Sequence, residues 1–282
     1  MMPGTGIKDL RRPKKCRSPV GMYEIETKPR TKLDDPERAQ KLRKTAAEHP
    51  NLAPALLELA DRLGSKSIRR RQTLASRQYM RKHRIRIGGE LWRLYDLFKQ
   101  TPRTFTLMPA GLTFAPYQLA GVDPRRLNNQ VRADLNRAGA GSADGWMLLC
   151  LDGEHDLRSG LFHIHFHGLA QGGMLEVLDR LRKQRRYKPQ PVSLGATGKT
   201  TPVYICRKPL TDLPKPLTYI VKSYWPSRAR GLGDSGTRVK PRPQRIPEPA
   251  HSQWLLWIDQ WRLKDIILLV KLRVVNGRLV PR

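Results

Sequence analysis

The chain has 282 residues, of which 54 are Lys or Arg and 24 are Asp or Glu, so its formal charge is +30. Hydrophobic residues make up 39% of it, enough for a core, which argues against a fully disordered chain. The longest apolar run, residues 266–270, is far shorter than the roughly 20 residues that span a bilayer. Three cysteines without metal-type spacing argue against a disulfide scaffold or zinc finger. We therefore expect a cytoplasmic protein without a membrane partner.

The charge indicates an anionic partner. A large positive excess costs self-repulsion unless an anion offsets it. Nucleic acid is the usual partner, because each neutralised phosphate releases condensed counterions and adds affinity. Charge alone does not separate an enzyme from a packaging protein.

The first third of the chain is basic and predominantly helical in pattern. Residues 1–35 are rich in Pro, Lys and Arg without periodic apolar positions, which predicts a disordered arm. Leucines at helical spacing predict a helix from Pro36 to Gly64. A carboxylate-free basic run over residues 66–86 and a further amphipathic helix ending near Pro102 complete a basic helical region.

The middle of the chain alternates between strand and helix patterns. Asp123 and Pro124 are a typical cap and first residue of a helix. The order β-α-β-β-α-β-α predicts an α+β fold with helices on one face of an antiparallel sheet. The predicted strands cover residues 104–108, 146–152, 161–170 and 202–206, and the predicted helices cover residues 123–138, 174–183 and 217–224.

The last part of the chain is predicted to be a linker and a helical appendage. Residues 227–250 are rich in Pro and Arg and predict a linker. Residues 251–282 predict one or two helices that carry Trp254, Trp257 and Trp261. These tryptophans could pack on the core, dimerise, or recruit a helicase or polymerase, and packing is the simplest of the three.

Three of the seven histidines lie within five residues of one another. Side chains two apart on a strand share a face, so His163, His165 and His167 line up while Ile164 and Phe166 point to the buried face. Such a row is either a set of surface histidines or a set of metal ligands, and we favour metal ligation.

Carboxylates are available beside this row. If residues 158–159 form the tip of a hairpin, Asp152 and Glu154 lie on the neighbouring strand opposite the histidines. Imidazoles mixed with a carboxylate suit a divalent ion such as Mg²⁺ or Mn²⁺. The sequence leaves open which carboxylate binds, because the register of the hairpin is not fixed by the pattern.

A second feature lies about fifty residues later. Tyr219 and Lys222 are three apart, so on a helix they share a face and the ammonium can lie near the phenolic oxygen. Tyr224 follows two residues after the lysine. By itself the pattern also fits an ordinary amphipathic helix with an extended lysine side chain.

The two features together resemble the HUH endonucleases, which include rolling-circle replication initiators and conjugative relaxases. His165-Phe-His167 matches the metal motif of that family, with His163 as an additional histidine. Tyr219-Ile-Val-Lys222 matches its nucleophile motif. The resemblance covers residues 103–226 and neither end of the chain.

This resemblance implies a ferredoxin-like, RRM-like antiparallel core that nicks single-stranded DNA with Mg²⁺ or Mn²⁺. Tyr219 would attack the phosphate, giving a 5′-phosphotyrosine and a free 3′-hydroxyl, with Tyr224 as a fallback. Lys222 would favour the phenolate or position the phosphate. The ion would be held by the histidines with Asp152 or Glu154.

The expected partners are single-stranded DNA or an origin hairpin, in rolling-circle replication or strand transfer, with a host helicase or polymerase as further candidates. Two other functions stay open. One is a non-catalytic basic nucleic-acid-binding protein whose histidines are structural or hold zinc, and the other is a nuclease that hydrolyses with water.

Overall fold

A computed structural model describes residues 7, 10, 28–67, 69–97, 101–189, 201–208, 210, 217, 219–229 and 243–282. Most of the predicted arm (residues 1–35) and of the predicted linker (residues 227–250) lies outside these residues. The elements are α1 (Lys28–Glu48), η3 (Pro50–Leu52), α2 (Ala53–Gly64), α3 (Arg77–Leu97), β1 (Arg103–Leu107), β2 (Thr113–Phe114), η4 (Pro116–Gly121), α4 (Pro124–Arg137), β3 (Trp146–Asp156), β4 (Phe162–Gln171), α5 (Met174–Leu181), η5 (Arg185–Tyr187), β5 (Val203–Ile205), β6 (Ser227–Arg228), α7 (Ala250–Asp259), α8 (Leu263–Ile266), β7 (Ile267–Val270), β8 (Leu272–Val275) and β9 (Arg278–Pro281).

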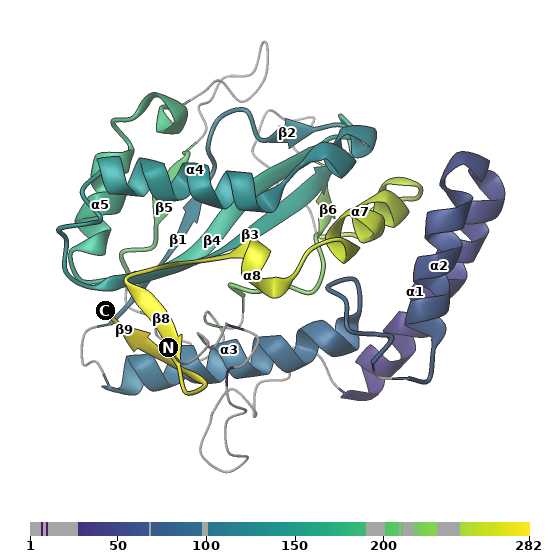
Figure 1. The fold of residues 1–282 in the computed structure, drawn as a ribbon. Coiled ribbons are helices and arrows are strands. Elements are labelled where there is room, and N and C mark those ends of the chain that lie inside the picture. The colour runs from purple at the N-terminus through teal and green to yellow at the C-terminus, as the bar shows by residue number, and fades with distance from the viewer. Residues whose placement is uncertain are drawn as a thin grey trace.

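The α+β prediction is confirmed. Seven of the described strands form one sheet with the order β5-β1-β4-β3-β6, in which β2 also pairs with β4 and β7 with β3. Every strand pair in this sheet is antiparallel except β3 with β6. Helices α4 and α5 lie along the same side of the sheet (Figure 1). The four predicted strands therefore form, within a few residues of their predicted bounds, the four adjacent strands β5-β1-β4-β3 of this sheet.

Helix α4 shows how local sequence signals produce this layer. Asp123 accepts a hydrogen bond from the backbone N–H of Arg125 at 2.8 Å, as an N-cap residue does, and Pro124 begins the helix. Val131 and Leu135 are buried on its inner face. Burying these apolar side chains against the sheet supplies most of the stability that a single short helix lacks.

The N-terminal region is an antiparallel pair of helices, α1 and α2, followed by a third helix, α3, which is as long as α1. The single helix predicted from Pro36 to Gly64 is instead α1 and α2, which pack on each other and are separated at Pro50. Helix α1 begins at Lys28, inside the predicted disordered arm, so that prediction is wrong for residues 28–35. A tertiary contact stabilises this part of α1. The buried carboxylate of Asp35 accepts hydrogen bonds from the hydroxyl of Ser76 and from the backbone N–H of Arg77.

The helical prediction for the C-terminus is wrong over residues 267–282, which form three strands. Strand β7 pairs with β3 in the central sheet, and β8 with β9 forms a hairpin. The short apolar run that opens this part is rich in residues that fit a buried strand, and its periodicity alone cannot distinguish a strand from a helix. The segment is thus joined to the central sheet and is not a helical appendage.

The tryptophans of α7 pack into the protein as predicted. Trp254 and Trp257 are buried, and both rings lie within 6.0 Å of the ring of Trp225. The indole N–H of Trp257 donates to the backbone oxygen of Val122 at 2.8 Å. This contact connects α7 to the short segment just before α4.

None of the helices in the described residues has the length and apolar character needed to cross a membrane.

A buried histidine in α3 makes stability depend on pH. His83 is buried beside the ring of Tyr79, with the ring centroids 4.5 Å apart, and burial lowers its pKa to about 4. The unfolded chain therefore binds more protons than the native state between that value and the ordinary value of about 6.5. The contribution of His83 to the free energy of unfolding is therefore fully present above pH 6.5, and it is lost as the pH is lowered towards 4.

We expect the free energy of unfolding to fall by about 2 to 3 kcal/mol more in the wild type than in His83→Gln between pH 7 and pH 4.5. Urea unfolding at both pH values measures this difference. The matched control is His49→Gln, at a partly exposed position, which should keep the wild-type pH dependence. Equal losses in the wild type and in His83→Gln would contradict the assignment.

Candidate metal centre and tyrosine cavity

The histidine row forms on β4 as predicted. His165 lies directly opposite Asp152 of β3, and His163 lies opposite Glu154. Ile164 and Phe166 are buried, because alternate side chains of a strand point to opposite faces. The register that the sequence left open is therefore fixed by the hairpin between β3 and β4.

Three of these side chains converge on one point. Oδ2 of Asp152 lies 3.6 Å from Nε2 of His165 and 3.2 Å from Nε2 of His167, and the two nitrogens are 3.1 Å apart. Atoms about 2.1 Å from a common ion lie about 3.0 Å apart at right angles and about 3.4 Å apart at a tetrahedral angle. The separations therefore fit a group that could hold a metal ion.

Further contacts orient the imidazoles for this role. Nδ1 of His165 lies 3.4 Å from the backbone oxygen of His163, which can only accept, so the contact requires the proton on Nδ1 and leaves the lone pair on Nε2. Nδ1 of His167 lies 3.0 Å from the hydroxyl of Thr106 on β1. Burial lowers the pKa of His167, although Asp152 partly opposes this, which favours the neutral imidazole that a metal requires.

Asp152 is the anionic centre of the group. Its side chain is buried, which by itself raises the pKa of a carboxyl group, but the Lys222 ammonium and the two imidazoles outweigh burial and hold the pKa well below its ordinary value. Nζ of Lys222 donates a hydrogen bond to Oδ2. Oδ1 is buried without a hydrogen-bond partner among the described residues. A buried, ionised carboxylate with one oxygen unmatched suits a further cation.

The other two predicted ligands lie next to this group and outside it. Nδ1 of His163 is 3.1 Å from the hydroxyl of Thr113 on β2. The carboxylate of Glu154 is 4.0 Å from Nε of Arg228. Of the two carboxylates that the sequence left open, the structure brings Asp152 to the histidines.

The residues around the predicted nucleophile do not form the predicted helix. Residues 219–224 consist of turns and bends, so Tyr219 and Lys222 do not share a helix face, and the prediction for residues 217–224 is wrong there. Ile220 and Val221 are both buried. Lys222, the next residue, donates a hydrogen bond to Asp152 of β3, so this irregular segment is held against the sheet by side chains on both sides of this position.

The tyrosines and the two histidines of the metal group nevertheless line one cavity. This cavity, which we call the tyrosine cavity, has a volume of about 710 Å³. Tyr219 is 56% exposed and Tyr224 is 41% exposed, so both phenols are accessible to a ligand. The cavity is lined by residues from β1, β3, β4, β5, β6 and the irregular segment, among them Thr106, Glu154, His165, His167, Tyr204, Tyr219, Lys222, Tyr224 and Arg228.

A glycine in β3 makes room for the irregular segment. A Cβ atom on Gly153 would lie only 2.7 Å from the ring of Trp225. We expect Gly153→Ala to displace that ring and to lower the free energy of unfolding by about 1 to 3 kcal/mol. Urea unfolding measures the change, and Gly121→Ala, where a Cβ would meet nothing within 4 Å, is the control. An equal effect at both positions would contradict the tight packing at Gly153.

The metal group predicts a specific binding result. We expect calorimetric titration with Mn²⁺ to give one ion per chain, and the double variant His165→Ala/His167→Ala to bind at least about a hundredfold more weakly. His163→Ala should bind within about fivefold of the wild type, because His163 lies outside the converging atoms. A loss in His163→Ala as large as in the double variant would contradict this ligand set.

Several residues of the site had no signal in the sequence. Thr106 contacts His167 from a strand sixty-one positions away, and Arg228 reaches the cavity wall only through the path of the irregular segment. The alternation of side chains along β1 could have indicated Thr106, since Thr106 faces the same side as the histidines when β1 pairs with β4.

Comparisons with models of known protein families, with curated proteins and with solved structures gave no match to this chain.

Proposed function

We propose that the protein is a metal-dependent endonuclease that nicks single-stranded DNA by transesterification onto Tyr219. The observation that carries this proposal is the convergence of Asp152 with His165 and His167, because both histidines line the same cavity as Tyr219 and Lys222. A nucleophile, a cation-binding group and an ammonium in one accessible cavity are the parts that phosphodiester transfer needs.

The fold supports the same proposal. Elements β1, α4, β3, β4, α5 and β5 follow one another in the order β-α-β-β-α-β, and their strands lie in the order β5-β1-β4-β3. A ferredoxin-like HUH endonuclease core would have this order of elements and strands, which supports the proposal. Fold alone does not establish function, so the argument depends on the site that this sheet presents.

In the proposed reaction the oxygen of Tyr219 attacks the phosphorus of a phosphodiester. A bond forms between that oxygen and phosphorus, and the bond from phosphorus to the 3′-oxygen breaks. The phenol proton passes to solvent, and the leaving oxygen takes up a proton to become a free 3′-hydroxyl. The 5′-phosphotyrosine keeps the energy of the broken bond, so the reverse reaction can rejoin an end, as rolling-circle replication or strand transfer requires.

The chain's own residues hold the reacting groups. Asp152, His165 and His167 would hold the divalent ion, which when bound would neutralise charge on the phosphate oxygens. Lys222 lies at the same carboxylate, so its ammonium adds positive charge where the phosphate would lie. With a formal charge of +30, the protein as a whole also attracts the DNA backbone.

One observation favours a second candidate, a basic DNA-binding protein without catalysis. Asp152 already has three polar neighbours in Lys222, His165 and His167, and such a network can be purely structural. The two functions differ in a simple experiment, because only the nickase becomes covalently attached to DNA.

The test is to incubate the protein with end-labelled single-stranded DNA and Mn²⁺ and to analyse the products on a denaturing gel. The nickase gives cleavage and a protein-linked strand, and both disappear with EDTA. Cleavage without attachment indicates a hydrolytic nuclease. Salt-dependent binding without cleavage, across metals and with origin-bearing as well as mixed sequences, would support the DNA-binding protein instead.

A further inference from the structure

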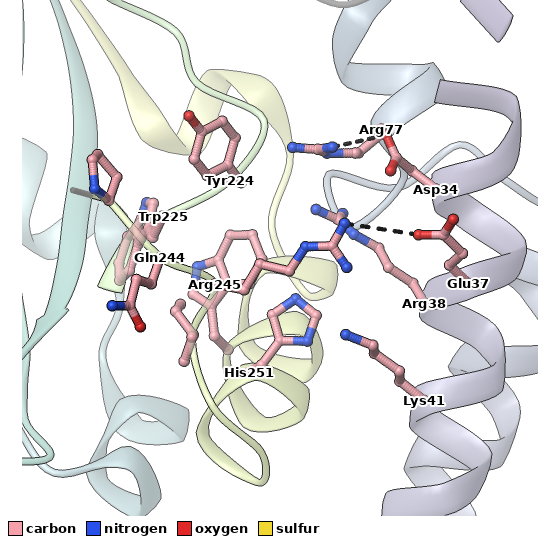
Figure 2. A pocket seen from close by; sticks show the side chains of 13 residues that line it. Asp34, Glu37, Arg38, Lys41, Arg77, Tyr224, Trp225, Gln244, Arg245 and His251 are labelled. Carbon is pink, nitrogen blue, oxygen red and sulfur yellow. Dashed lines mark hydrogen bonds and ion pairs between the residues drawn. The ribbon is translucent and has the colours of Figure 1, made fainter. Parts of the chain in front are cut away.

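A second pocket adjoins the tyrosine cavity. This pocket, which we call the α1 pocket, has a volume of about 240 Å³ and lies between helix α1, helix α7 and the segment around Tyr224 (Figure 2). Tyr224 and Pro243 line both spaces. A ligand in the α1 pocket would therefore lie next to a ligand in the tyrosine cavity.

The α1 pocket is cationic. Its lining has four permanent cations, Arg38, Lys41, Arg77 and Arg245, and two carboxylates, Asp34 and Glu37, so these charges give it a net +2. His251 also lines it, but burial lowers the pKa of that imidazole, so it adds no charge at neutral pH. An excess of two positive charges in a partly enclosed space favours a phosphate.

The cations differ in how strongly they are already paired. Arg77 forms a close ion pair with Asp34 at 2.7 Å. Arg245 is more weakly paired, because its guanidinium is 3.9 Å from the carboxylate of Glu37. Lys41 is exposed and makes no ion pair within the described part of the chain. Figure 2 shows Lys41 pointing into the pocket from α1 and the side chain of Arg245 reaching across towards the same helix. Lys41 and Arg245 are therefore the cations most available to an anionic ligand.

Tyr224 supplies an aromatic surface at the boundary between the two spaces. The guanidinium carbon of Arg77 lies 5.1 Å from the centroid of its ring, in the range of a cation–π contact. The side chain is 41% exposed, so part of the ring is open to solvent. Partly open aromatic rings beside cations are the usual platforms for the bases of a single strand.

Helix α1 also fixes the position of this platform. The buried guanidinium of Arg38 donates to the backbone oxygen of Ser223 at 3.3 Å and to that of Ala75. It thus connects α1 and the turn before α3 to the residue that precedes Tyr224. The pocket wall and the stacking surface are held together by one buried cation.

We propose that the α1 pocket binds a phosphodiester group that neighbours the one cut in the tyrosine cavity, with a base of the same single strand stacked on Tyr224. This inference rests on the proposed function, since it assumes a single-stranded DNA substrate. It assigns the N-terminal helices to substrate binding, and it makes Tyr224 a binding residue and not a second nucleophile. A strand that crosses Tyr224 would place adjacent phosphates in the two spaces.

The first part of the test compares two double variants with the same change of charge. Lys41→Gln/Arg245→Gln removes the two available cations of the pocket. Lys32→Gln/Arg273→Gln removes two exposed cations elsewhere, and Lys32, nine residues before Lys41, lies on the opposite side of α1. The affinity for a labelled single-stranded oligonucleotide of mixed sequence is measured in EDTA over a series of salt concentrations.

We expect the pocket variant to bind about tenfold more weakly, and its plot of log affinity against log salt to be shallower by about 0.7 for each phosphate that the protein no longer neutralises. The control variant should stay within about twofold of the wild type. Equal affinity and equal salt dependence in the two double variants would overturn the phosphate assignment. Thermal unfolding of each variant shows that the chain is folded.

The second part tests Tyr224. Tyr224→Phe keeps an aromatic face and should bind within about twofold of the wild type, whereas Tyr224→Ala should bind about tenfold more weakly. Unchanged binding in Tyr224→Ala, or a Tyr224→Phe protein that binds as weakly as Tyr224→Ala, would overturn the stacking assignment.

Failure of this inference and failure of the proposed function give different results. Binding in EDTA does not require nicking. If the variants bind as expected but no protein-linked strand ever forms, the pocket stands as a single-strand site and the nickase is wrong. If a Tyr219-linked strand forms and the two double variants bind alike, the nickase stands and the pocket assignment is wrong.

Discussion

Tyr219→Phe should lower the yield of protein-linked DNA by at least about a thousandfold, while the affinity for single-stranded DNA stays within about threefold. The substitution removes only the oxygen that would attack phosphorus, and it keeps the ring that lines the cavity. Because the side chain is 56% exposed, losing its hydroxyl leaves no buried polar group unpaired, so the fold should be unaffected. A denaturing gel measures the product, and fluorescence anisotropy measures the binding.

The control is Tyr117→Phe, which removes a phenolic oxygen from a side chain that is 75% exposed and lies outside the tyrosine cavity. It should form the protein-linked product at the wild-type rate. A product that persists in Tyr219→Phe and disappears in Tyr219→Phe/Tyr224→Phe would assign the nucleophile to Tyr224. Cleavage that continues in both variants without attachment would identify water as the nucleophile.

The metal group could be predicted from sequence because it depends on strand periodicity. Once residues 162–171 form a strand, a spacing of two places His165 and His167 on one face, independently of how that strand pairs. The choice between Asp152 and Glu154 could not be made in this way, since it depends on the register of the hairpin. Shifting that register would bring a different carboxylate opposite His165, and a turn whose type is unknown leaves the register open.

The position of Tyr219 near the metal group was expected, but for a reason that the structure does not bear out. A helix over residues 217–224 predicts that Tyr219 and Lys222 meet each other. Instead, the irregular segment carries Lys222 to Asp152, seventy positions earlier in the chain. This contact decides the path of the segment, and no local pattern records it.

The same limit applies to the two ends of the chain. Residues 28–35 are helical because Asp35 is held by Ser76, and Arg38 reaches Ser223 across 185 positions. Residues 267–270 form a strand because they pair with β3 along one of its edges. Local propensity cannot predict contacts of this kind, because long-range packing overrides it.

Lys222→Met should lower the free energy of unfolding in EDTA by roughly 3 to 5 kcal/mol, the usual cost of removing one partner of a buried ion pair. Asp152 is 2% exposed, so without the ammonium its charge would have only the two imidazoles beside it. Methionine keeps most of the volume of the lysine stem, so the change tests the charge more than the packing. Urea unfolding measures the loss, and Lys264→Met at an exposed position should change stability by less than about 0.5 kcal/mol.

Two further measurements show that the loss arises at Asp152. The double variant Asp152→Asn/Lys222→Met should be more stable in EDTA than Lys222→Met alone, because it no longer buries an uncompensated charge. Added Mn²⁺ should stabilise Lys222→Met more than the wild type, since an ion bound only by the native state would replace the missing positive charge. A Lys222→Met protein as stable as the wild type would show that the ammonium does not compensate Asp152. The proposed nicking mechanism would then lack the electrostatic link between the segment that carries Tyr219 and the metal group.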